Sequence, residues 1–383
     1  MQELYVDSPE AMADLCQRLA ASRWLTLDTE FMREKTYYPQ LCLLQVATPE
    51  LAACVDPLAT DIGPLLDLLY DERIVKVFHA ARQDLELLYG LRGSVPQPLF
   101  DTQLAATVLG FGDQIGYGSL VKLLLDVDLD KGQTRTDWSR RPLDAEQIRY
   151  AFDDVRYLVE VYRRIEALLA EKGRSDWLAE DFTALSDPAA YVGTPDEAWR
   201  RIKGNSRLRG VQLAALQGLA AWREEEARAR DLPRRWVVSD EVLLEVARHL
   251  PDKPARLERI RGIPRQLLDR HAGALLARIE AARELPKAAW PVLAPRRSFT
   301  PAQDSVLDAM TAVVRQCGVE QQVSPAAIAT RRDLEQLLDE GDSPVLHGWR
   351  AAVAGRRLQA FIEGKLHLGV AAGALVMEDA TGT

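Results

Sequence analysis

The sequence contains few of the residues that build zinc sites and disulfide frameworks. It has four cysteines among 383 residues, and no two of them have the CxxC spacing of a zinc ligand pair or a redox motif. The five histidines are scattered and form no HxxxH pair. We therefore expect free thiols in a reducing compartment, and neither a zinc site nor a redox motif.

Long apolar runs are also missing. No run approaches the roughly 20 residues that a membrane span requires, and the N-terminus carries Glu3, Asp7 and Glu10 where a signal peptide would carry positive charge. The chain is 47% hydrophobic and 27% charged, which is an ordinary globular balance. These features predict a cytoplasmic protein that does not enter a membrane. No obligate protein partner is evident.

Positive charge is scarce only in the first half of the chain. The net charge is −9. Residues 1–190 hold 19 Lys and Arg against 32 Asp and Glu, a net −13, which leaves 29 against 25, a net +4, for the remainder. An acidic front half fits metal ligands and solvated helices, and a basic back half fits a phosphate backbone.

The order of strand and helix patterns predicts an α/β domain followed by helical units. Apolar, β-rich runs at 24–31, 41–48, 51–56 and 74–78 alternate with helical patterns up to about residue 172. Two Pro-rich breaks follow, and the segments after them have helical patterns. We predict a domain at 1–190, a linker at 191–206, and helical domains at 207–287 and 296–375, with a frayed tail.

The clearest chemical signal is a pair of carboxylates inside a predicted strand. Asp28 and Glu30 are two residues apart, so they project from the same face, while Leu27 and Thr29 face the other way. Adjacent carboxylates in an apolar strand repel each other unless a cation lies between them. The alternative is a strand end that is open to water.

Two further acidic positions are weak signals when each is taken alone. Asp84 falls in the first turn of a predicted helix, where the helix dipole by itself favours a carboxylate. Tyr150 and Asp154 are four residues apart on a predicted helix and therefore share a face. Together with Asp28 and Glu30, these residues form an oxygen-rich set that suits two hard cations such as Mg²⁺ or Mn²⁺.

The order DxE, then Asp, then Tyr-x-x-x-Asp resembles the tyrosine-bearing branch of the DEDD exonuclease superfamily. The stretches LDTEFMREKTYYPQLCLLQVA, HAARQDLELL, PLFDTQLAA and RTDWSRRPLDAEQIRYAFDDVRYL are similar to the ribonuclease D family. A segment from about residue 207 to 284 resembles the HRDC domain, and the second helical unit fits a tandem HRDC arrangement less clearly. The resemblance implies a ribonuclease H-like mixed sheet followed by two all-helical HRDC-like domains.

The resemblance also implies a role for each of the five residues. Asp28 is expected to bridge both metal ions, and Glu30 and Asp154 to complete the site of the ion that activates water. Asp84 is expected to help hold the second ion, largely through water. Tyr150 is expected to orient the nucleophilic water by position more than as a strong base.

Three other residues near these motifs are candidates for substrate contacts. Tyr37 and Gln45 lie close to the DTE strand in sequence and could line the path of the terminal nucleotides. His79 could contact a phosphate. Core packing for Tyr37 and a structural role for His79 are the alternatives.

A basic stretch around one aromatic residue is a further candidate. Trp138 and Arg141 lie together with Lys131, Arg135 and Arg140. Basic residues interleaved with an aromatic fit contact with a single strand, and a loop that only covers the core is the alternative.

The helical half begins with a dense basic run. Arg200, Arg201, Lys203 and Arg207 follow Trp199 within a few residues. Helical surfaces often carry charge without a function, but the resemblance to domains that grip structured RNA favours RNA binding. The charge split predicts that a chain ending near Asp196 would still cleave short oligonucleotides but lose most of its preference for structured precursors, because the helical half supplies the grip. The alternative is that the helical half only stabilises the front domain.

The leading interpretation is a 3′→5′ exoribonuclease that trims 3′ ends and releases nucleoside 5′-monophosphates. The substrates implied by the resemblance are tRNA precursors and other small structured RNAs with a free 3′ end. A DNA-directed 3′→5′ exonuclease is one alternative, although no attached polymerase or helicase motor is evident. A catalytically silent RNA-binding scaffold is the other, and the complete ligand set argues against it.

Overall fold

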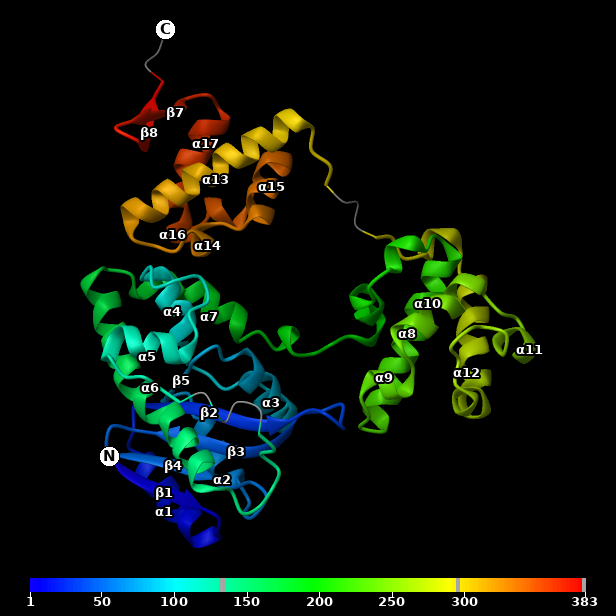
Figure 1. Ribbon diagram of the computed structural model, residues 1–383, viewed down its shortest axis with the longest axis horizontal. Coiled ribbons are helices and arrows are strands. Elements are labelled where there is room, and N and C mark those ends of the chain that lie inside the picture. Colours follow the sequence, from blue (N-terminus) through cyan, green and yellow to red (C-terminus); the bar gives the residue numbers. More distant parts are fainter. Residues whose placement is uncertain (131, 133–135, 294–296, 381–383) are drawn as a thin grey trace.

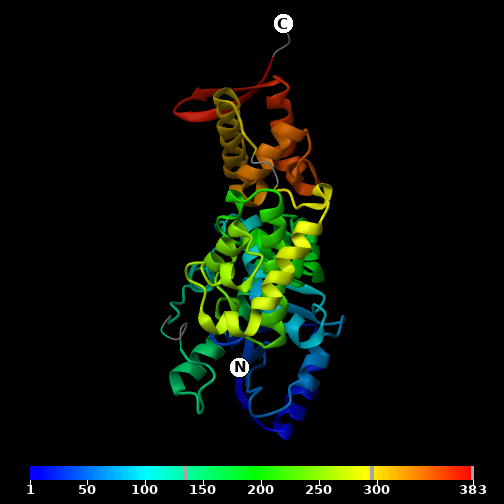
Figure 2. The same ribbon diagram turned by 90° about the vertical axis from the view of Figure 1, so that its right-hand side faces the viewer.

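A computed structural model describes residues 1–130, 132, 136–293 and 297–380 of the chain. It has an α/β front domain (residues 1–190), a first helical unit (195–293) and a second helical unit (297–380). The first unit lies beside the front domain and the second lies over one end of it (Figure 1). In Figure 2 the first unit faces the viewer.

The front domain is built on a six-stranded mixed sheet with the order β1-β4-β3-β2-β5-β6. The central strand β2 pairs antiparallel with β3 and parallel with β5. Apolar runs form the inner strands, as the sequence predicted; the short strands β1 and β6 were not predicted. The strands are β1 (Gln2–Val6), β2 (Trp24–Met32), β3 (Gln40–Ala47), β4 (Leu51–Val55), β5 (Val75–Phe78) and β6 (Leu99–Asp101).

Helices cover both faces of this sheet. One face packs on α1, α2 and α3, through residues such as Leu15, Leu65 and Leu85. The other packs on the long helix α6, which buries Ala151, Phe152 and Val155 against β3 and β4. The helices are α1 (Pro9–Leu19), α2 (Gly63–Leu69), α3 (Arg82–Arg92), α4 (Thr102–Val108), α5 (Tyr117–Leu125), α6 (Ala145–Glu171), η1 (Ser175–Leu178), α7 (Ala179–Leu185) and η2 (Pro188–Ala190).

The first helical unit includes much of the segment that was predicted as a linker. Trp199 on η3 is fully buried in the core of this unit, where it packs with Leu216 and Leu219 of α8. Residues 195–207 therefore belong to the unit, because an apolar anchor holds them. The elements are η3 (Pro195–Arg201), η4 (Asn205–Arg207), α8 (Val211–Ala229), α9 (Arg234–Val237), α10 (Asp240–His249), α11 (Pro254–Leu257), α12 (Arg265–Glu284) and η5 (Lys287–Ala289).

The second helical unit ends in a two-stranded antiparallel hairpin that the sequence analysis did not predict. The expectation of a frayed tail was wrong at 374–379, which form a strand paired with 366–371. No helix in the described ranges is long and apolar enough to span a membrane. The elements are α13 (Pro301–Gln321), α14 (Pro325–Ile328), α15 (Arg331–Glu340), η6 (Pro344–Leu346), α16 (Gly348–Arg350), η7 (Ala351–Gly355), α17 (Arg356–Ile362), β7 (Leu366–Ala371) and β8 (Ala374–Asp379).

The front domain and the second helical unit share one hydrophobic core. Leu158 and Ile165 of α6 belong to the same buried cluster as Leu307 and Met310 of α13. Gly110, at φ +82°, lies against the backbone of Gln322, whose carbonyl oxygen would be 2.6 Å from an added Cβ atom. A chain ending near residue 196 would lack the part of this core that the second helical unit contributes and would expose the remainder, so we expect the second helical unit to stabilise the front domain.

Aromatic and polar contacts reinforce that junction. The rings of Trp177 and Trp349 stack with their centroids 4.6 Å apart and their planes 3° apart. The Arg350 guanidinium donates to the carboxylate of Asp181 at 3.0 and 3.1 Å. The junction thus combines apolar burial with satisfied polar groups, which is typical of a permanent interface.

Candidate active site

Three carboxylates meet between the central strand and α6. One carboxylate oxygen from each of Asp28, Glu30 and Asp154 lies within 4.8 Å of the others. Asp28 and Glu30 share the face of β2 that Thr26 also occupies, and the Thr26 hydroxyl donates to the Val155 carbonyl on α6 at 3.0 Å. This bond fixes the face of β2 against α6, so the acids of both elements point into one space.

Burial and mutual repulsion raise the pKa values of these acids. The pKa of Glu30 rises to about 9, first because of burial and then because of Asp154 and Asp84. Burial raises the pKa of Asp154 to about 8, with a smaller contribution from Asp153. Burial and the neighbouring acids raise the pKa of Asp28 well above its usual range.

The donor set fits a hard divalent cation. The clustered side chains offer only oxygen ligands, which Mg²⁺ and Mn²⁺ prefer. Among the described residues, the buried Oδ2 atom of Asp154 has no hydrogen-bond partner, although a buried polar atom is normally satisfied. A cation would satisfy that oxygen and offset the repulsion within the cluster.

Asp84 approaches the same strand from the opposite face. Its Oδ1 accepts a hydrogen bond of 2.5 Å from the Thr29 hydroxyl, and it does not belong to the group of three acids. Burial raises the pKa of Asp84 to about 7 even though the Thr29 bond lowers it. Asp84 raises the pKa values of Asp28 and Glu30, so it is close enough to act on the site through its charge.

The carboxylate of Asp101 fixes the start of the helix that carries Asp84. It accepts from the backbone N–H groups of Ala80 and Ala81 at 3.1 and 2.9 Å, and it also caps α4 by accepting from Gln103. Ala80 has a φ of 58°, which is uncommon for a residue with a side chain. Local spacing in the sequence does not reveal these contacts of Asp101, because the two residues lie 20 and 21 positions earlier in the chain.

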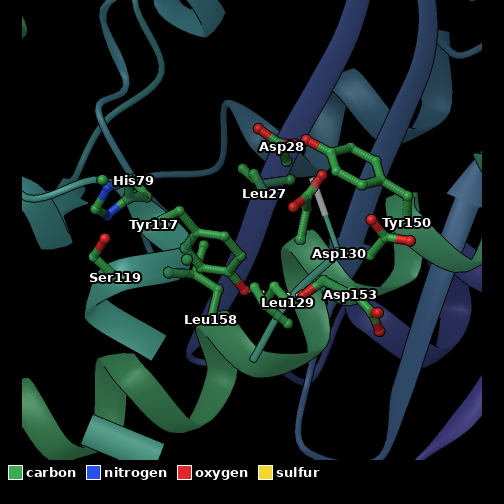
Figure 3. A pocket seen from close by; sticks show the side chains of 13 residues that line it. Leu27, Asp28, His79, Tyr117, Ser119, Leu129, Asp130, Tyr150, Asp153 and Leu158 are labelled. Carbon is green, nitrogen blue, oxygen red and sulfur yellow. Dashed lines mark hydrogen bonds between the residues drawn. The ribbon is translucent and has the colours of Figure 1, made fainter. Parts of the chain in front are cut away.

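Tyr150 lies one turn before Asp154 on α6, and its ring extends towards Asp28 (Figure 3). Burial, followed by the charges of Asp154, Glu30 and Asp28, raises the pKa of this phenol above its usual range. The hydroxyl therefore stays protonated at neutral pH and can donate a hydrogen bond into the acidic cluster.

A cavity of about 330 Å³ opens beside these residues. Figure 3 shows Asp28, Tyr150 and Asp153 around it, together with Asp130 from the segment after α5. The remaining lining residues are Leu27, His79, Gly116, Tyr117, Gly118, Ser119, Leu129, Asp154 and Leu158. The carboxylates therefore border a space that a small group from solvent can enter.

His79 and Gln45 were predicted as candidate substrate contacts, but each is enclosed by protein groups. His79 lines the cavity, but Nδ1 lies 3.0 Å from the Thr102 hydroxyl and Nε2 lies 3.0 Å from the Ile115 carbonyl. This pairing fits the structural role. Gln45 is fully buried opposite Asp28 in the β2–β3 register. In the part of the chain that the structure describes, its amide oxygen and nitrogen have no hydrogen-bond partner. Because Gln45 is buried beside a candidate metal ligand, it does not line an open path.

Trp138 and Arg141 contribute to packing in this structure. Trp138 is 2% exposed and lies within the core beneath α6, with its ring centroid 6.1 Å from that of Tyr150. Arg141 donates to both carboxylate oxygens of Asp56 at 2.5 and 2.8 Å. These contacts fit a segment that covers the core. Lys131 and Arg135 lie outside the described residues.

Tyr37 contacts the first helical unit. It lies at the tip of the β2–β3 hairpin, which reaches α9 (Figure 1). Its hydroxyl donates to the buried Glu224 and accepts from Arg228 at 2.9 Å and from Arg234 at 3.0 Å. The Arg234 guanidinium also lies 4.6 Å from the centroid of the ring. The prediction of a substrate contact is replaced by an anchor between domains, because the side chain is already surrounded by protein partners. We call this set of contacts the Tyr37 anchor.

The basic residues of the first helical unit are divided between two places. Arg200, Arg201 and Lys203 line a groove beside η3 and η4. Arg207 is exposed and does not line that groove.

Comparisons with known proteins define the class of protein. Residues 4–170 match the family model described as a 3′-5′ exonuclease, and residues 212–279 match the HRDC domain. The second match lies inside the predicted domain at 207–287, whose limits remain a prediction. The fold and the acidic site thus belong to a 3′→5′ exonuclease domain that is followed by an HRDC domain.

Full-length relatives identify the family. Ribonuclease D of Sphingobium indicum is 42% identical over 98% of both chains, and that of Nitrobacter hamburgensis is 39% identical over 95% of this chain and 96% of its own. The crystal structure of Escherichia coli RNase D, described as an exoribonuclease involved in structured RNA processing, has a TM-score of 0.83 and 34% identity over 95% of this chain and 99% of that one. The chain belongs to the ribonuclease D family and is a hydrolase.

Proposed function

We propose that this protein trims the 3′ ends of tRNA precursors and other small structured RNAs, releasing nucleoside 5′-monophosphates. The observation that carries the proposal is the group of three carboxylates whose oxygens lie within 4.8 Å of one another. The relative from Escherichia coli, described as processing structured RNA, supports the choice of substrate. A cytoplasmic location is part of the proposal.

The five predicted residues would divide the work at the cleavage site. Two divalent cations, Mg²⁺ or Mn²⁺, would supply the charge that stabilises the attacking and leaving oxygens of the phosphodiester. Asp28 would contact both, with Glu30 and Asp154 on the side of the water and Asp84 on the side of the leaving group. The protonated Tyr150 hydroxyl would orient the water.

The raised pKa values support this assignment. Acids with pKa values of about 8 and 9 would be largely protonated at neutral pH without a cation. Binding of a divalent ion releases those protons, because only the ionised carboxylate is a good ligand. The site is therefore expected to be inactive in EDTA and active when Mg²⁺ or Mn²⁺ is restored.

Digestion of a 3′-extended tRNA precursor and of a DNA strand with the same sequence tests the proposal. With Mg²⁺ or Mn²⁺ we expect stepwise shortening of the RNA from its 3′ end, 5′-monophosphate products, and slower loss of the DNA. Equal rates on RNA and DNA would favour the DNA-directed alternative. Binding of the precursor without hydrolysis under either metal would favour the silent scaffold.

A further inference from the structure

A groove of about 1130 Å³ lies on the first helical unit. The residues that line it come later in the chain than those of the acidic cluster. One wall comes from the chain between η3 and α8, and the other from the segment that follows α12. The lining residues are Arg200, Arg201, Ile202, Lys203, Gly204, Asn205, Ser206, Leu208, Arg209, Gly210, Leu213, Lys287, Trp290, Pro291, Val292 and Leu293.

The groove is positively charged. Five of its lining residues are Lys or Arg, and none is Asp or Glu. Arg200 pairs with Glu197 outside the groove. Within the described part of the chain, Arg201, Lys203 and Lys287 have no carboxylate partner, and all three are exposed. Unpaired cations that surround a concave surface attract anions, because no internal partner competes for them.

The other wall carries Lys287 and is otherwise apolar and aromatic. Trp290, Pro291, Val292 and Leu293 follow one another along it, and Val292 is 77% exposed. Trp290 packs against Gly210, where an added Cβ atom would be 3.0 Å from the ring. Gly210 also has a φ of 54°. Glycine is therefore favoured there both because the ring leaves no room for a side chain and because the backbone is in the left-handed region. This close approach fixes the aromatic wall against the start of α8.

The start of α8 strengthens the positive potential of the groove. Gly210 is the N-cap of this 19-residue helix, and no side chain caps it. The first turn has no acidic residue, so the positive end of the helix dipole is not neutralised locally. This end adds to the charge of Arg201, Lys203 and Lys287.

We infer that this groove binds an unpaired stretch of an RNA substrate, with phosphates along the basic wall and bases against the aromatic wall. Cations that follow a backbone beside an aromatic side chain are the physical basis of single-strand binding. The inference rests on the proposed function, because it takes the bound polyanion to be the RNA that the front domain shortens.

The groove lies almost entirely outside the residues that match the HRDC domain. The match to that domain covers residues 212–279, and Leu213 alone among the lining residues falls inside it. The binding surface is therefore built by the segments before and after the domain, which meet at the Gly210–Trp290 contact.

Equilibrium binding of the full-length protein to a fluorescent 3′-extended tRNA precursor tests this inference. The measurement is made in EDTA, so that hydrolysis does not enter, and at several NaCl concentrations. The groove variant carries Arg201→Ala, Lys203→Ala and Lys287→Ala. A matched control carries Lys253→Ala, Arg259→Ala and Arg270→Ala, which removes the same charge from exposed positions outside the groove.

The groove variant is expected to bind more weakly and with a smaller salt dependence. Each contact with a single-strand phosphate contributes about 0.7 to the slope of log K against log salt, so three contacts should lower the slope by about 2. The control should lower it by less than half of that. Equal losses of affinity and of salt dependence in the two variants would overturn the inference, since positive charge anywhere on the first helical unit would then be sufficient for RNA binding.

The aromatic wall has its own test. Stacking of one base on an aromatic ring is worth about 1–3 kcal/mol, which corresponds to a loss of roughly fivefold or more in affinity for Trp290→Ala, at an unchanged salt slope. Trp290→Phe should restore most of it. Equal binding by Trp290→Ala and the wild type would contradict the base-stacking role.

Hydrolysis by the wild-type protein is measured separately, so RNA binding through the groove without hydrolysis would remove the proposed function and leave this inference intact.

Discussion

Each carboxylate of the three-acid group should be required for hydrolysis and not for folding. Asp28→Asn, Glu30→Gln and Asp154→Asn keep the volume of the side chain and remove an ionisable group from a repelling cluster. We expect less than about a tenth of the wild-type rate at saturating Mg²⁺, with a metal-free melting temperature that is unchanged or higher.

Glu160→Gln provides the control for these variants. It removes an acid from the same helix, where Glu160 is paired with Arg164 away from the cavity. Its rate should match that of the wild type. A three-acid variant that keeps most of its rate would contradict the assignment of metal ligands.

The hydroxyl of Tyr150 should contribute to turnover and not to metal affinity. Tyr150→Phe keeps the ring that packs near Trp138 and loses one hydrogen-bond donor. We expect turnover to fall by about 10²–10⁴, the range of a well-positioned proton-handling group. Metal titrations of activity give the comparison: if the Mg²⁺ concentration at half-maximal rate rises as much as in Asp154→Asn, Tyr150 is a ligand and not an orienting group.

The stability of the metal-free protein should fall as pH rises. Glu30 and Asp154 have pKa values of about 9 and about 8 when folded, against ordinary values of about 4 in the unfolded chain. Between about pH 4 and pH 9 the folded protein therefore binds more protons than the unfolded one, so deprotonation in this window favours unfolding.

Melting temperatures in EDTA and in Mg²⁺ between pH 6 and pH 9 check this expectation. The decline should appear in EDTA and be reduced by Mg²⁺, which holds the ionised carboxylates. Glu30→Gln, which cannot titrate, should decline less steeply than the wild type. Parallel curves for the two proteins would show that Glu30 does not have a raised pKa.

Local spacing accounts for which residues of the candidate site could be predicted. Asp28 and Glu30 share a face because strands repeat every two residues, and Tyr150 and Asp154 share one because they are four apart on a helix. The partners of Arg141 and Tyr37 are 85 and 187 residues away. No sequence period reports such distances, so an interdomain contact and a partly buried ion pair were both predicted as candidate substrate contacts.

At the scale of elements, the β2–β3 hairpin should depend on one hydroxyl for its attachment to the first helical unit. Tyr37→Phe removes all three hydrogen bonds of the Tyr37 anchor that involve its hydroxyl and leaves the ring beneath Arg234. A loss of about 1–2 kcal/mol corresponds to a population of open hairpin that is roughly five- to thirtyfold higher.

Trypsin cleavage after the exposed Lys35 measures that opening. The rate should rise in Tyr37→Phe and stay unchanged in Tyr38→Phe, because Tyr38 is 49% exposed and contacts Asp231 through its backbone N–H. If both variants are cleaved at the wild-type rate, the Tyr37 anchor does not hold the tip of the hairpin.

Long, strongly patterned elements were the ones that the sequence predicted. The run WLTLDTEF and the helical pattern at 144–172 appear as β2 and α6 within one or two residues. β1, β6 and the β7–β8 hairpin were missed, because strands of three to six residues at an edge have little periodicity and form mainly through their pairing partners.

At the scale of the whole molecule, the second helical unit should be needed for the stability of the front domain. Trp349 is 9% exposed and stacks on Trp177, so Trp349→Ala should cost about 3–5 kcal/mol and lower the melting temperature by several degrees. Trp236→Ala serves as the control, since Trp236 is 61% exposed and its loss should cost less than about 0.5 kcal/mol. Equal melting temperatures for the two variants would show that the junction is not a joint core.

The shared core of the front domain and the second helical unit also determines when a newly made chain can finish folding. Leu158 belongs to the same buried cluster as Leu307 and Leu358. Those two residues leave the ribosome long after α6, so this part of the core cannot form before then. At about 5–20 residues per second, the intervening chain takes roughly 10–40 s to synthesise. During that delay the five candidate catalytic residues have already been made, but the scaffold that stabilises them is incomplete. A nascent chain beside ribosomal and messenger RNA would therefore acquire a stable nuclease domain only after the second helical unit has been synthesised.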